Sequence, residues 1–354
     1  MTVLVRESSA ILENAAAALC SPARMRVLES LAQRQFFKLI LGGSFSDTAK
    51  IAQLVTVYAQ AGIEMIDCAP ELPVLEAVAA GLRETGLPQA QWPMVMVSLP
   101  LDPDPHFRKI ELLESLCIAC DACIPICPTQ ALSVSADNAS LIAIDQPLCY
   151  GCGRCVPTCP TTALVLNPLY SDPSALLDTV LAHPLVGAVE IHSRYMDPVM
   201  MAEFLAKFSS GLANKLLSVC FRPNESTTPF WQASLAHLRD FVTQAQGKAS
   251  PLIVQIDGAP MSGSHDRDAS LPSLHNAQHW ITAYGELLPA GVALTLSGGI
   301  NLATPQWLSQ LPVGHHVQGV GVGTVARQWV WHELELGQMA QAVVKARRFV
   351  SQFR

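Results

Sequence analysis

Short hydrophobic segments recur along this chain, separated by stretches long enough to form helices. In eight segments nearly every position is apolar, which is typical of parallel β-strands that are buried on both faces. These predicted strands span residues 36–41, 63–68, 94–99, 186–192, 216–221, 252–257, 292–297 and 317–322. Between the first two, residues 47–61 predict a helix with Asp47 as its N-cap.

The alternation of strands and helices predicts an α/β protein with a TIM-like (β/α)8 barrel. A doubly wound open sheet is the alternative, because strand counts taken from a sequence are error-prone. On the barrel interpretation the chain has four parts: a helical extension closing the barrel bottom (1–31), barrel strands one to three (32–105), an inserted module (106–168) and barrel strands four to eight (169–354). An insertion after the third strand would lie at the C-terminal face, where barrel active sites form.

The inserted module contains one cysteine pattern twice, C-x2-C-x2-C-x3-C-P, which is the spacing of bacterial ferredoxins. The first copy is Cys117, Cys120, Cys123 and Cys127, and the second is Cys149, Cys152, Cys155 and Cys159. Structural zinc is the alternative, since zinc sites also use C-x2-C pairs. Zinc explains neither the third closely spaced cysteine nor the proline after the fourth.

Two [4Fe-4S] clusters fit this pattern, because three cysteines on one tight loop leave a cluster corner for a distant cysteine. In two-cluster ferredoxins the fourth cysteine of each run ligates the other cluster. The predicted ligands are Cys117, Cys120, Cys123 and Cys159 for one cluster, and Cys149, Cys152, Cys155 and Cys127 for the other. The residues after each run also repeat (128–132 and 160–164), which predicts a ferredoxin-like α+β module with pseudo-twofold symmetry.

The residues around the two cysteine runs differ in charge. Asp121 lies inside the first run, whereas Gly151, Gly153 and Arg154 lie inside the second. Charge and hydrogen bonds near a cluster help to set its reduction potential. We therefore expect the cluster within the second run to be reduced more easily.

Composition narrows the range of functions. The chain has 354 residues, 50% of them hydrophobic and 14% charged, so it can bury a large core. Its net charge of −7 does not favour nucleic-acid binding. No apolar run reaches the roughly 18 residues that span a bilayer, and no signal-peptide pattern begins the chain. We expect a cytoplasmic protein without a transmembrane segment.

Three cysteines lie outside the module: Cys20, Cys68 and Cys220. Lone thiols in a reducing compartment are usually inert core residues. Cys68 and Cys220 end predicted strands, so a thiol linked to the clusters is the alternative for these two.

Glycines follow the last two predicted strands, at the face where barrels bind ligands. Gly298 and Gly299 follow the seventh strand, and Gly321 and Gly323 lie at the end of the eighth. In many barrels these loops and an adjoining helix N-terminus hold a phosphate, because glycine lets backbone amides approach the anion. The pattern resembles the phosphate site of flavin-binding barrels, so FMN is a candidate cofactor. Ordinary tight turns are the alternative.

Polar residues also mark the predicted strand ends, where barrel enzymes place catalytic or binding groups. They are Asp67, Glu190, His192, Arg194, Arg222 and Asp257. His192 with Arg194 and Arg222 could bind an anion, whereas salt bridges at the barrel rim are the alternative. The catalytic residues stay unassigned, since neither a nucleophile with its base nor a lysine placed for a Schiff base is recognisable.

Two further features lie near the barrel ends. His315 and His316 precede the eighth strand. They should therefore lie at the end of the barrel opposite the C-terminal face, which we call the mouth, and this argues against a metal role there. Residues 261–273 are polar and rich in Gly, Ser and Asp, which predicts a mobile loop over the mouth.

The segments FFKLILGGS (36–44) and AGIEMIDCA (61–69), together with the inserted ferredoxin module, resemble the cyanobacterial light-dependent period family over nearly the full chain. Gly43 and Cys68 stand where relatives would have other small residues, a departure that leaves the cluster ligands untouched. The resemblance implies an iron–sulfur protein that reports cellular redox state, and hence light, to the circadian clock. It also implies clock-input and oscillator proteins as partners. Only the eight cluster cysteines carry over as site residues.

Two hypotheses of function follow. The first is a non-enzymatic redox sensor, in which the state of the clusters changes the affinity of the protein for a partner. The second is a ferredoxin-coupled barrel oxidoreductase, in which a redox partner and the clusters pass electrons to a flavin or another phosphate-bearing ligand. A simple electron carrier would leave the barrel without a purpose, so we rank the sensor first and the carrier last.

Overall fold

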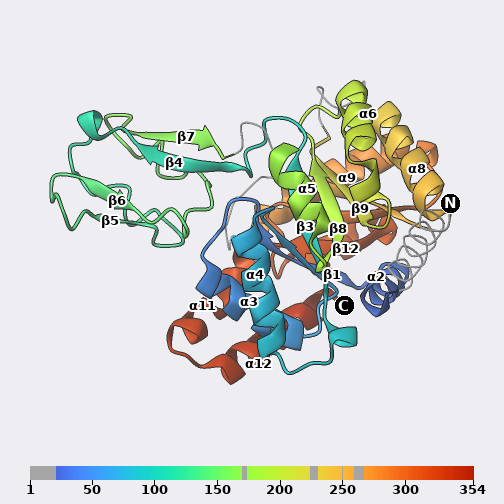
Figure 1. Ribbon diagram of the computed structural model, residues 1–354, viewed down its shortest axis with the longest axis horizontal. Coiled ribbons are helices and arrows are strands. Elements are labelled where there is room, and N and C mark those ends of the chain that lie inside the picture. The colour runs from blue at the N-terminus through green and yellow to red at the C-terminus, as the bar shows by residue number, and fades with distance from the viewer. Residues whose placement is uncertain (1–20, 170–173, 224–229, 249, 259–266) are drawn as a thin grey trace, which may run out of the picture.

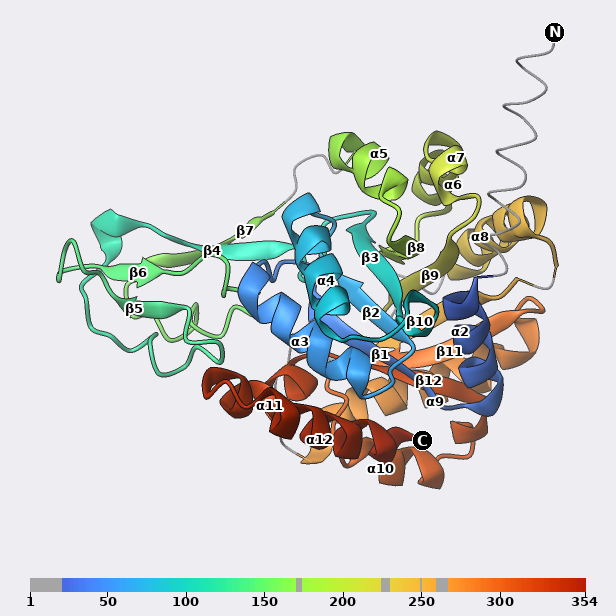
Figure 2. The same cartoon turned by 60° about the horizontal axis from the view of Figure 1, so that its bottom comes forward.

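The computed structural model describes residues 21–169, 174–223, 230–248, 250–258 and 267–354. Within these residues, eight parallel strands close into a barrel. Figures 1 and 2 show its strands surrounded by helices. The strands are β1 (Phe36–Gly42), β2 (Met65–Cys68), β3 (Met94–Pro100), β8 (Val186–His192), β9 (Leu216–Phe221), β10 (Leu252–Asp257), β11 (Val292–Ser297) and β12 (Val317–Val322). The barrel closes because β1 pairs with both β2 and β12. All eight predicted strands and the (β/α)8 fold are confirmed, and the open sheet is excluded.

Helices surround the barrel and cover the outer faces of its strands (Figure 2). They are α3 (Thr48–Gln60), α4 (Leu72–Glu84), α5 (Ser174–Ala182), α6 (Pro198–Lys207), α7 (Ser209–Leu212), α8 (Trp231–Gln246), α9 (Leu271–Tyr284), α10 (Thr304–Gln310), α11 (Thr324–Glu335) and α12 (Met339–Val350). The predicted N-cap of α3 is confirmed, because Asp47 Oδ1 accepts a hydrogen bond from the Lys50 amide at 2.9 Å. Among the described residues, the barrel domain also has five short 3-10 helices: η1 (Gln89–Gln91), η3 (Arg267–Ser270), η4 (Gly285–Leu287), η5 (Gly314–His316) and η6 (Ser351–Phe353).

The N-terminal end of the barrel is filled with apolar side chains and covered by helix α2 (Pro22–Gln33). Val27 and Leu31 of α2 pack against Phe36, Met65 and Met94, which point into the barrel. Arg24 extends across this end and donates hydrogen bonds to Gln246 (2.6 Å) and Ser250 (2.9 Å). Burying a leucine side chain such as Leu31 stabilises the folded state by roughly 1.5–3 kcal/mol. Helix α2 therefore seals the bottom of the barrel, while the first 20 residues lie outside the described part.

The inserted module projects from one side of the barrel, at the left of Figures 1 and 2. Strands β4 (Arg108–Leu112) and β7 (Leu164–Pro168) form one antiparallel pair, and β5 (Leu132–Val134) and β6 (Ile142–Ile144) form another. Its helical content is limited to the 3-10 helix η2 (Glu114–Leu116) and to turns. The module has its own small core, in which Ile110, Leu132 and Leu164 pack together with cysteines.

The module follows β3 in the chain, and α5 resumes the barrel after it. Several contacts hold it against the barrel rim. Lys109 Nζ donates to Ser46 Oγ at 3.1 Å, and the Ser46 amide donates to the Pro147 carbonyl at 3.1 Å. The ring of Phe107 fills the space above Gly43, where an added Cβ would lie 2.6 Å from the ring. Gly43 thus lets the connection between barrel and module pack closely.

The predicted mobile loop at 261–273 is wrong for its second half. Residues 267–270 form η3, and residues 271–273 begin α9. The polar residues there are used in the fold, because Ser273 is buried and its hydroxyl donates to the Ser297 carbonyl at 2.5 Å. Residues 261–266 lie outside the described residues.

A helix that crosses a membrane must be both long and apolar. Across the described ranges, every helix is either too short or too polar to cross a bilayer.

Candidate functional site

The structure gathers the eight module cysteines around two small cavities. Cys117, Cys120, Cys123 and Cys159 line one cavity of about 320 Å³. Cys149, Cys152, Cys155 and Cys127 line the other, of about 350 Å³. Each cavity thus receives three thiols from one run and the fourth from the other run, which is the arrangement of two-cluster ferredoxins. Both volumes include the part open to solvent, and the four thiols around each cavity are a donor set that fits an iron–sulfur cluster.

The two cysteine loops have the same backbone conformation despite different residues. Ala119 and Asp121 in the first loop have φ angles of 48° and 56°, and the matching Gly151 and Gly153 have 69° and 75°. The left-handed region is uncommon for residues other than glycine. The first loop tolerates side chains there, whereas a Cβ on Gly151 would lie 1.9 Å from the Arg108 carbonyl oxygen. The second loop therefore needs glycine because it lies close to β4.

The fourth cysteines of the two runs also have matching hydrogen bonds. Cys127 Sγ accepts from the Ala131 amide at 3.2 Å, and Cys159 Sγ accepts from the Ala163 amide at 3.2 Å. Hydrogen bonds to sulfur favour the thiolate and influence the potential of a cluster. The sequence repeat at 128–132 and 160–164 therefore corresponds to a repeated sulfur environment.

Positive charge is concentrated around the second cavity. The charges of Arg108, Arg154 and Arg327 all act on Cys152. Asp121, in contrast, lines the first cavity. Arg108 is held against the second loop, where its Nε donates to the Gly151 carbonyl at 3.4 Å. The structure thus adds two arginines from outside the cysteine runs to the charge asymmetry visible in the sequence.

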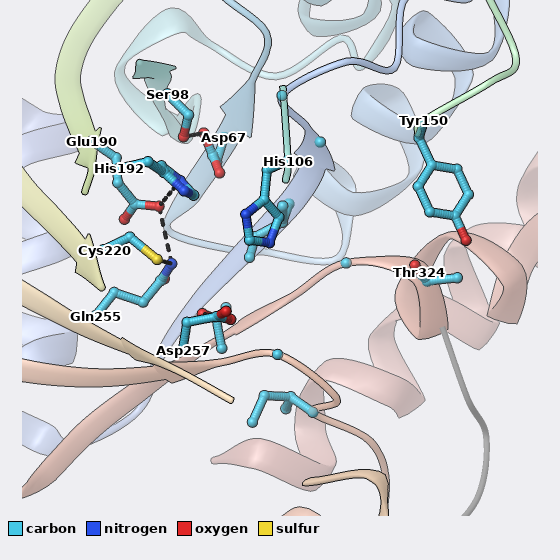
Figure 3. Close-up of a pocket in the computed structure, with 18 of the residues that line it drawn as sticks. Asp67, Ser98, His106, Tyr150, Glu190, His192, Cys220, Gln255, Asp257 and Thr324 are labelled. Atoms are coloured by element: carbon cyan, nitrogen blue, oxygen red, sulfur yellow. Dashed lines mark hydrogen bonds and ion pairs between the residues drawn. The ribbon is translucent and has the colours of Figure 1, made fainter. Parts of the chain in front are cut away.

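A third and larger cavity, of about 790 Å³ including the part open to solvent, occupies the barrel mouth (Figure 3). Its lining includes eight of the glycines and polar residues predicted at the strand ends: Gly298, Gly299, Gly321, Gly323, Asp67, Glu190, His192 and Asp257. Gly298 and Gly299 have φ angles of 74° and 80°, and Gly323 is the residue before helix α11. The two glycine loops and a helix N-terminus therefore meet at one cavity, as a phosphate site requires.

A network of buried polar groups centred on Glu190 forms part of the cavity wall and extends below it to Lys38. Lys38 Nζ lies 2.6 Å from Glu190 Oε2, which also accepts from Ser218 Oγ at 2.7 Å. Gln255 Nε2 donates to Glu190 Oε1 at 3.0 Å, and His192 Nε2 lies 3.2 Å from the same oxygen (Figure 3). The barrel interior thus changes from apolar at its sealed end to polar at its open end.

Burial and charge act in opposite directions on this network. Burial works to lower the pKa of Lys38, but the negative charges of Glu190 and Asp67 and the hydrogen bond to Glu190 together outweigh it, so the pKa is raised. Burial works to raise the pKa of Glu190, but Lys38 and His192 hold it well below its usual range. Burial raises the pKa of Asp67 to about 6, although Lys38 opposes this. Lys38 and Glu190 are therefore both charged at neutral pH.

The lone thiols Cys68 and Cys220 are both buried. Burial raises the pKa of each thiol well above its ordinary value, and the negative charges of nearby carboxylates add to this. Cys220 lines the barrel cavity and accepts a hydrogen bond from Gln255 at 3.4 Å, whereas Cys68 Sγ lies 3.5 Å from the Met96 carbonyl oxygen. Both are protonated core thiols, and Cys20 lies outside the described residues.

The anion site predicted from His192, Arg194 and Arg222 is wrong. The Arg194 side chain is exposed, stacks on Tyr195 at 5.5 Å and does not line the mouth cavity. The Asp102 carboxylate accepts hydrogen bonds from the backbone amides of both residues, which fixes the backbone there. Arg222 donates to the Gly258 carbonyl and does not line the mouth cavity. His315 and His316 lie in η5, before β12 and away from the mouth, as expected.

Sequence reasoning missed two residues at or near the mouth, Lys38 and His106. Lys38 is a charged residue within an apolar strand, and that interruption was the one signal that could have revealed it. His106 belongs to the proline-bearing connection after β3, and it reaches the mouth because this connection folds back over the barrel. Its ring lies 5.1 Å from that of His192. Burial works to lower the pKa of His106, but the adjacent Asp104 carboxylate outweighs it and raises the pKa to about 9.

Tyr150 connects the barrel mouth to the second cysteine cavity. This residue stands between Cys149 and Gly151, is buried, and lines both cavities. The Arg327 guanidinium lies 4.9 Å from its ring, and its hydroxyl points toward Thr324 (Figure 3). Burial raises the pKa of Tyr150 to about 12, so it stays protonated at neutral pH. One aromatic side chain therefore separates the second cysteine site from the barrel interior.

Comparisons with known families cover most of the chain. Residues 116–163 match the 4Fe-4S dicluster domain, and residues 180–351 match the light dependent period A C-terminal domain. The chain is 30% identical over 311 residues to "Light dependent period A" of Synechococcus elongatus, an alignment that spans 85% of this chain and 82% of that protein.

Solved structures resemble the chain only distantly. Tryptophan synthase from M. tuberculosis has 10% identity and a TM-score of 0.41, over 93% of this chain and 99% of that one. Dihydrodipicolinate synthase from Agrobacterium tumefaciens has 10% identity and a TM-score of 0.37, over 91% of this chain and 81% of that one.

Proposed function

This chain belongs to the light dependent period A family, and on that premise we propose that it is an iron–sulfur redox sensor whose module signals to the barrel. The chain would hold two [4Fe-4S] clusters, with Cys117, Cys120, Cys123 and Cys159 as ligands of the first. Cys149, Cys152, Cys155 and Cys127 would be the ligands of the second. When bound, such clusters supply reversible one-electron chemistry.

The observation that carries the proposal is the position of Tyr150 between the second cysteine cavity and the barrel mouth. A change of charge in the second cavity acts directly on the adjacent Arg327. Arg327 in turn donates hydrogen bonds to the Ile40 and Leu41 carbonyls at the end of β1. The redox state of the module can therefore alter the shape of the barrel mouth through a short chain of contacts.

A sensor requires that a partner bind the two redox states with different affinity. The surface formed by the barrel mouth and the module is the part of the protein that this chain of contacts would change. By family membership we propose that the partners are clock-input and oscillator proteins and that the readout is the circadian period in light. The place of action would be the cytoplasm.

The polar barrel cavity favours a second candidate function, a ferredoxin-coupled oxidoreductase. Gly298, Gly299 and Gly323 would hold the phosphate of FMN or of another ligand at the N-terminus of α11. Gly321 leaves room inside the barrel, since a Cβ there would lie 2.9 Å from both Gln255 and Ile40. The second cysteine site would then deliver electrons past Tyr150 to a ligand in the cavity.

Cofactor content separates the two candidates. The protein is purified anaerobically, and iron, sulfide and flavin are measured per chain, with spectra before and after acid treatment. About eight irons without flavin would support the sensor. Stoichiometric flavin that remains after the clusters are destroyed would support the oxidoreductase.

The sensor is then tested in cells. The chain replaces its relative in Synechococcus elongatus, and the circadian period is recorded at several light intensities. Cys152→Ser should remove the second cluster and weaken the dependence of the period on light, whereas Cys68→Ser, a buried thiol outside both cysteine cavities, is the matched control. A light-dependent period that stays the same in Cys152→Ser would reject the sensor.

A further inference from the structure

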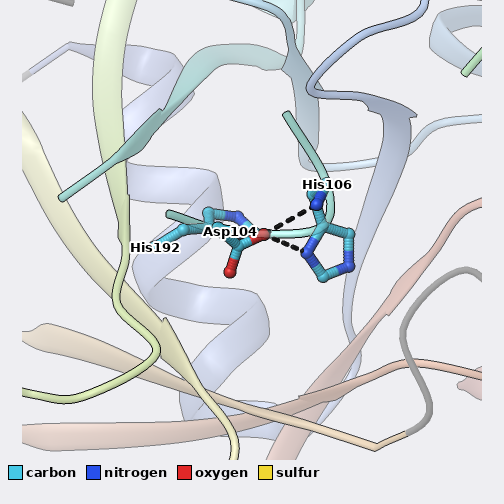
Figure 4. Close-up of side chains that lie close together, drawn as sticks. All are labelled: Asp104, His106 and His192. Atoms are coloured by element: carbon cyan, nitrogen blue, oxygen red, sulfur yellow. Dashed lines mark hydrogen bonds and ion pairs between the residues drawn. The ribbon is translucent and has the colours of Figure 1, made fainter. Parts of the chain in front are cut away.

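We propose that Asp104, His106 and His192 form a binding site for a first-row divalent metal ion at the barrel mouth, separate from the two cysteine sites. Each residue contributes one ligand atom, and the three atoms lie within 4.8 Å of one another (Figure 4). Two imidazoles and one carboxylate are a common ligand set for mononuclear iron(II), manganese and zinc. The site is formed by the folded chain, because β8 supplies His192 and the connection after β3 supplies the other two residues.

The three ligand atoms lie close enough together to share one ion after the side chains adjust. Asp104 Oδ1 lies 2.6 Å from His106 Nδ1 and 3.9 Å from His192 Nδ1. An ion about 2.1 Å from each ligand places neighbouring ligand atoms roughly 3–3.5 Å apart. These two distances lie on either side of this range, so the side chains would shift to complete the site when an ion binds. The ion would take the place of the proton that Asp104 and His106 share.

His192 shows the strongest sign of a missing ligand. Its Nε2 lies 3.2 Å from Glu190 Oε1, and Glu190 is fully buried. Its Nδ1 is buried and has no hydrogen-bond partner among the described residues. If Nε2 carries the proton and donates it to Glu190, then Nδ1 presents a lone pair toward the Asp104 carboxylate. Two acceptors that face each other in a buried place are stabilised by a cation between them.

Glu190 also supplies what a metal-binding histidine needs behind it. Ligating histidines usually donate their second ring N–H to a carboxylate or carbonyl, which fixes the tautomer and the ring orientation. The Glu190 carboxylate is itself held by Lys38, Ser218 and Gln255. The orientation of His192 is therefore fixed from inside the barrel before an ion binds.

The site is open to ligands on one side. His106 and His192 line the mouth cavity, and the side chains of Asp104, His106 and His192 are 11%, 21% and 8% exposed. With three protein ligands, the remaining coordination positions would face this cavity. Water, or an oxygen atom of a small carboxylate or phosphate compound, would fill them.

The test uses the protein with its iron–sulfur clusters intact and Mn²⁺ as the probe, because Mn²⁺ prefers nitrogen and oxygen ligands to thiolates. Free Mn²⁺ is counted by its EPR signal during an anaerobic titration of the oxidised protein. We expect one tight site per chain, and Asp104→Asn and His106→Ala should each weaken it roughly tenfold or more. His316→Ala removes an imidazole at the opposite end of the barrel and should leave binding unchanged.

Iron content and circular dichroism of each variant show whether the fold and the clusters are retained. Asp104→Asn keeps the shape of the side chain, so this variant tests the site even if His106→Ala does not fold. Equal Mn²⁺ affinity in wild type, Asp104→Asn and His106→Ala would overturn the proposal. No binding by wild type at millimolar Mn²⁺ would overturn it as well.

Discussion

Lys38 and Glu190 form an ion pair inside the barrel, with 2.6 Å between Lys38 Nζ and Glu190 Oε2 and both side chains almost completely buried. Removing one member of such a pair leaves an uncompensated buried charge, which costs about 3–5 kcal/mol. We therefore expect Lys38→Met to destabilise the protein by about that amount. Urea unfolding followed anaerobically by circular dichroism measures the change in the free energy of unfolding. The double variant Lys38→Met/Glu190→Gln should recover part of the loss, and a single-variant loss below about 1 kcal/mol would contradict the expectation.

Helix α2 should contribute to stability through the face that seals the barrel. Leu31 is 3% exposed and packs into the barrel bottom, whereas Met25 on the same helix is 45% exposed. Leu31→Ala should cost about 2–4 kcal/mol, because it leaves a cavity in a packed core. Met25→Ala should change the free energy of unfolding by less than about 0.5 kcal/mol. Similar effects of the two substitutions would show that α2 does not seal the barrel.

Gly151 should be required for the second cluster. Gly151 and Gly86 have nearly the same φ, 69° and 67°, but only Gly151 has a backbone oxygen where a Cβ would be. Gly86→Ala should cost about 1–2 kcal/mol through its backbone conformation alone and keep all its iron. Gly151→Ala should lose about half of the iron, because the second loop can no longer lie against Arg108. Iron and sulfide analysis decides, and full iron content in Gly151→Ala would refute this role.

Tyr150 should protect the second cluster from solvent that enters through the barrel mouth. Its ring lies between the two cavities, so Tyr150→Ala would join them. In Tyr150→Ala we expect the second cluster, which holds about half of the iron, to be lost in air faster than in wild type, because exposure of a cluster promotes its oxidation. Loss of the iron–sulfur absorption with time gives the rate. Tyr150→Phe keeps the ring and should behave like wild type, and an equally slow loss in Tyr150→Ala would reject the barrier.

The charges near the two cysteine sites predict the order of reduction. Arg154 acts on Cys152 of the second site, and Asp121 lines the first. A positive charge stabilises the more negative, reduced cluster, so the second site should have the higher midpoint potential. Arg154→Gln should lower this higher midpoint, and Asp121→Asn should raise the lower one by less, because Asp121 is exposed and screened by solvent. A potentiometric titration followed by EPR tests this, and a shift of the wrong midpoint would count against it.

Much of the fold could be predicted because its signals are local. Continuous hydrophobicity marked all eight barrel strands, and the strand bounds differ from the structure by at most a few residues. The cysteine spacing predicted three cysteines of each cavity, because they lie on one short loop. The ferredoxin rule that the fourth cysteine of each run serves the other cluster predicted the fourth. The glycines after the last two strands were found for the same reason, because strand ends of a parallel barrel meet at one face.

The failures concern side chains whose direction depends on distant parts of the chain. Arg194 follows a strand end but points to solvent, because Asp102 from the connection after β3 fixes its backbone. His106 is remote from every predicted strand end, yet this connection brings it to the mouth. Position in the sequence does not show which side chains a long loop will place over a barrel.

The sequence by itself determined the barrel, the position of the inserted module and the cysteine content of its two sites. Hydrophobic periodicity and cysteine spacing are short-range properties, and each is readable within a few residues. Only the tertiary structure decided that Lys38 pairs with Glu190, that Tyr150 separates the second cysteine site from the mouth, and that Asp104 and His106 meet His192. These contacts join residues that lie far apart in the chain. The closed barrel brings Lys38 to Glu190, whereas the connection after β3 and the inserted module bring Asp104, His106 and Tyr150 to the mouth.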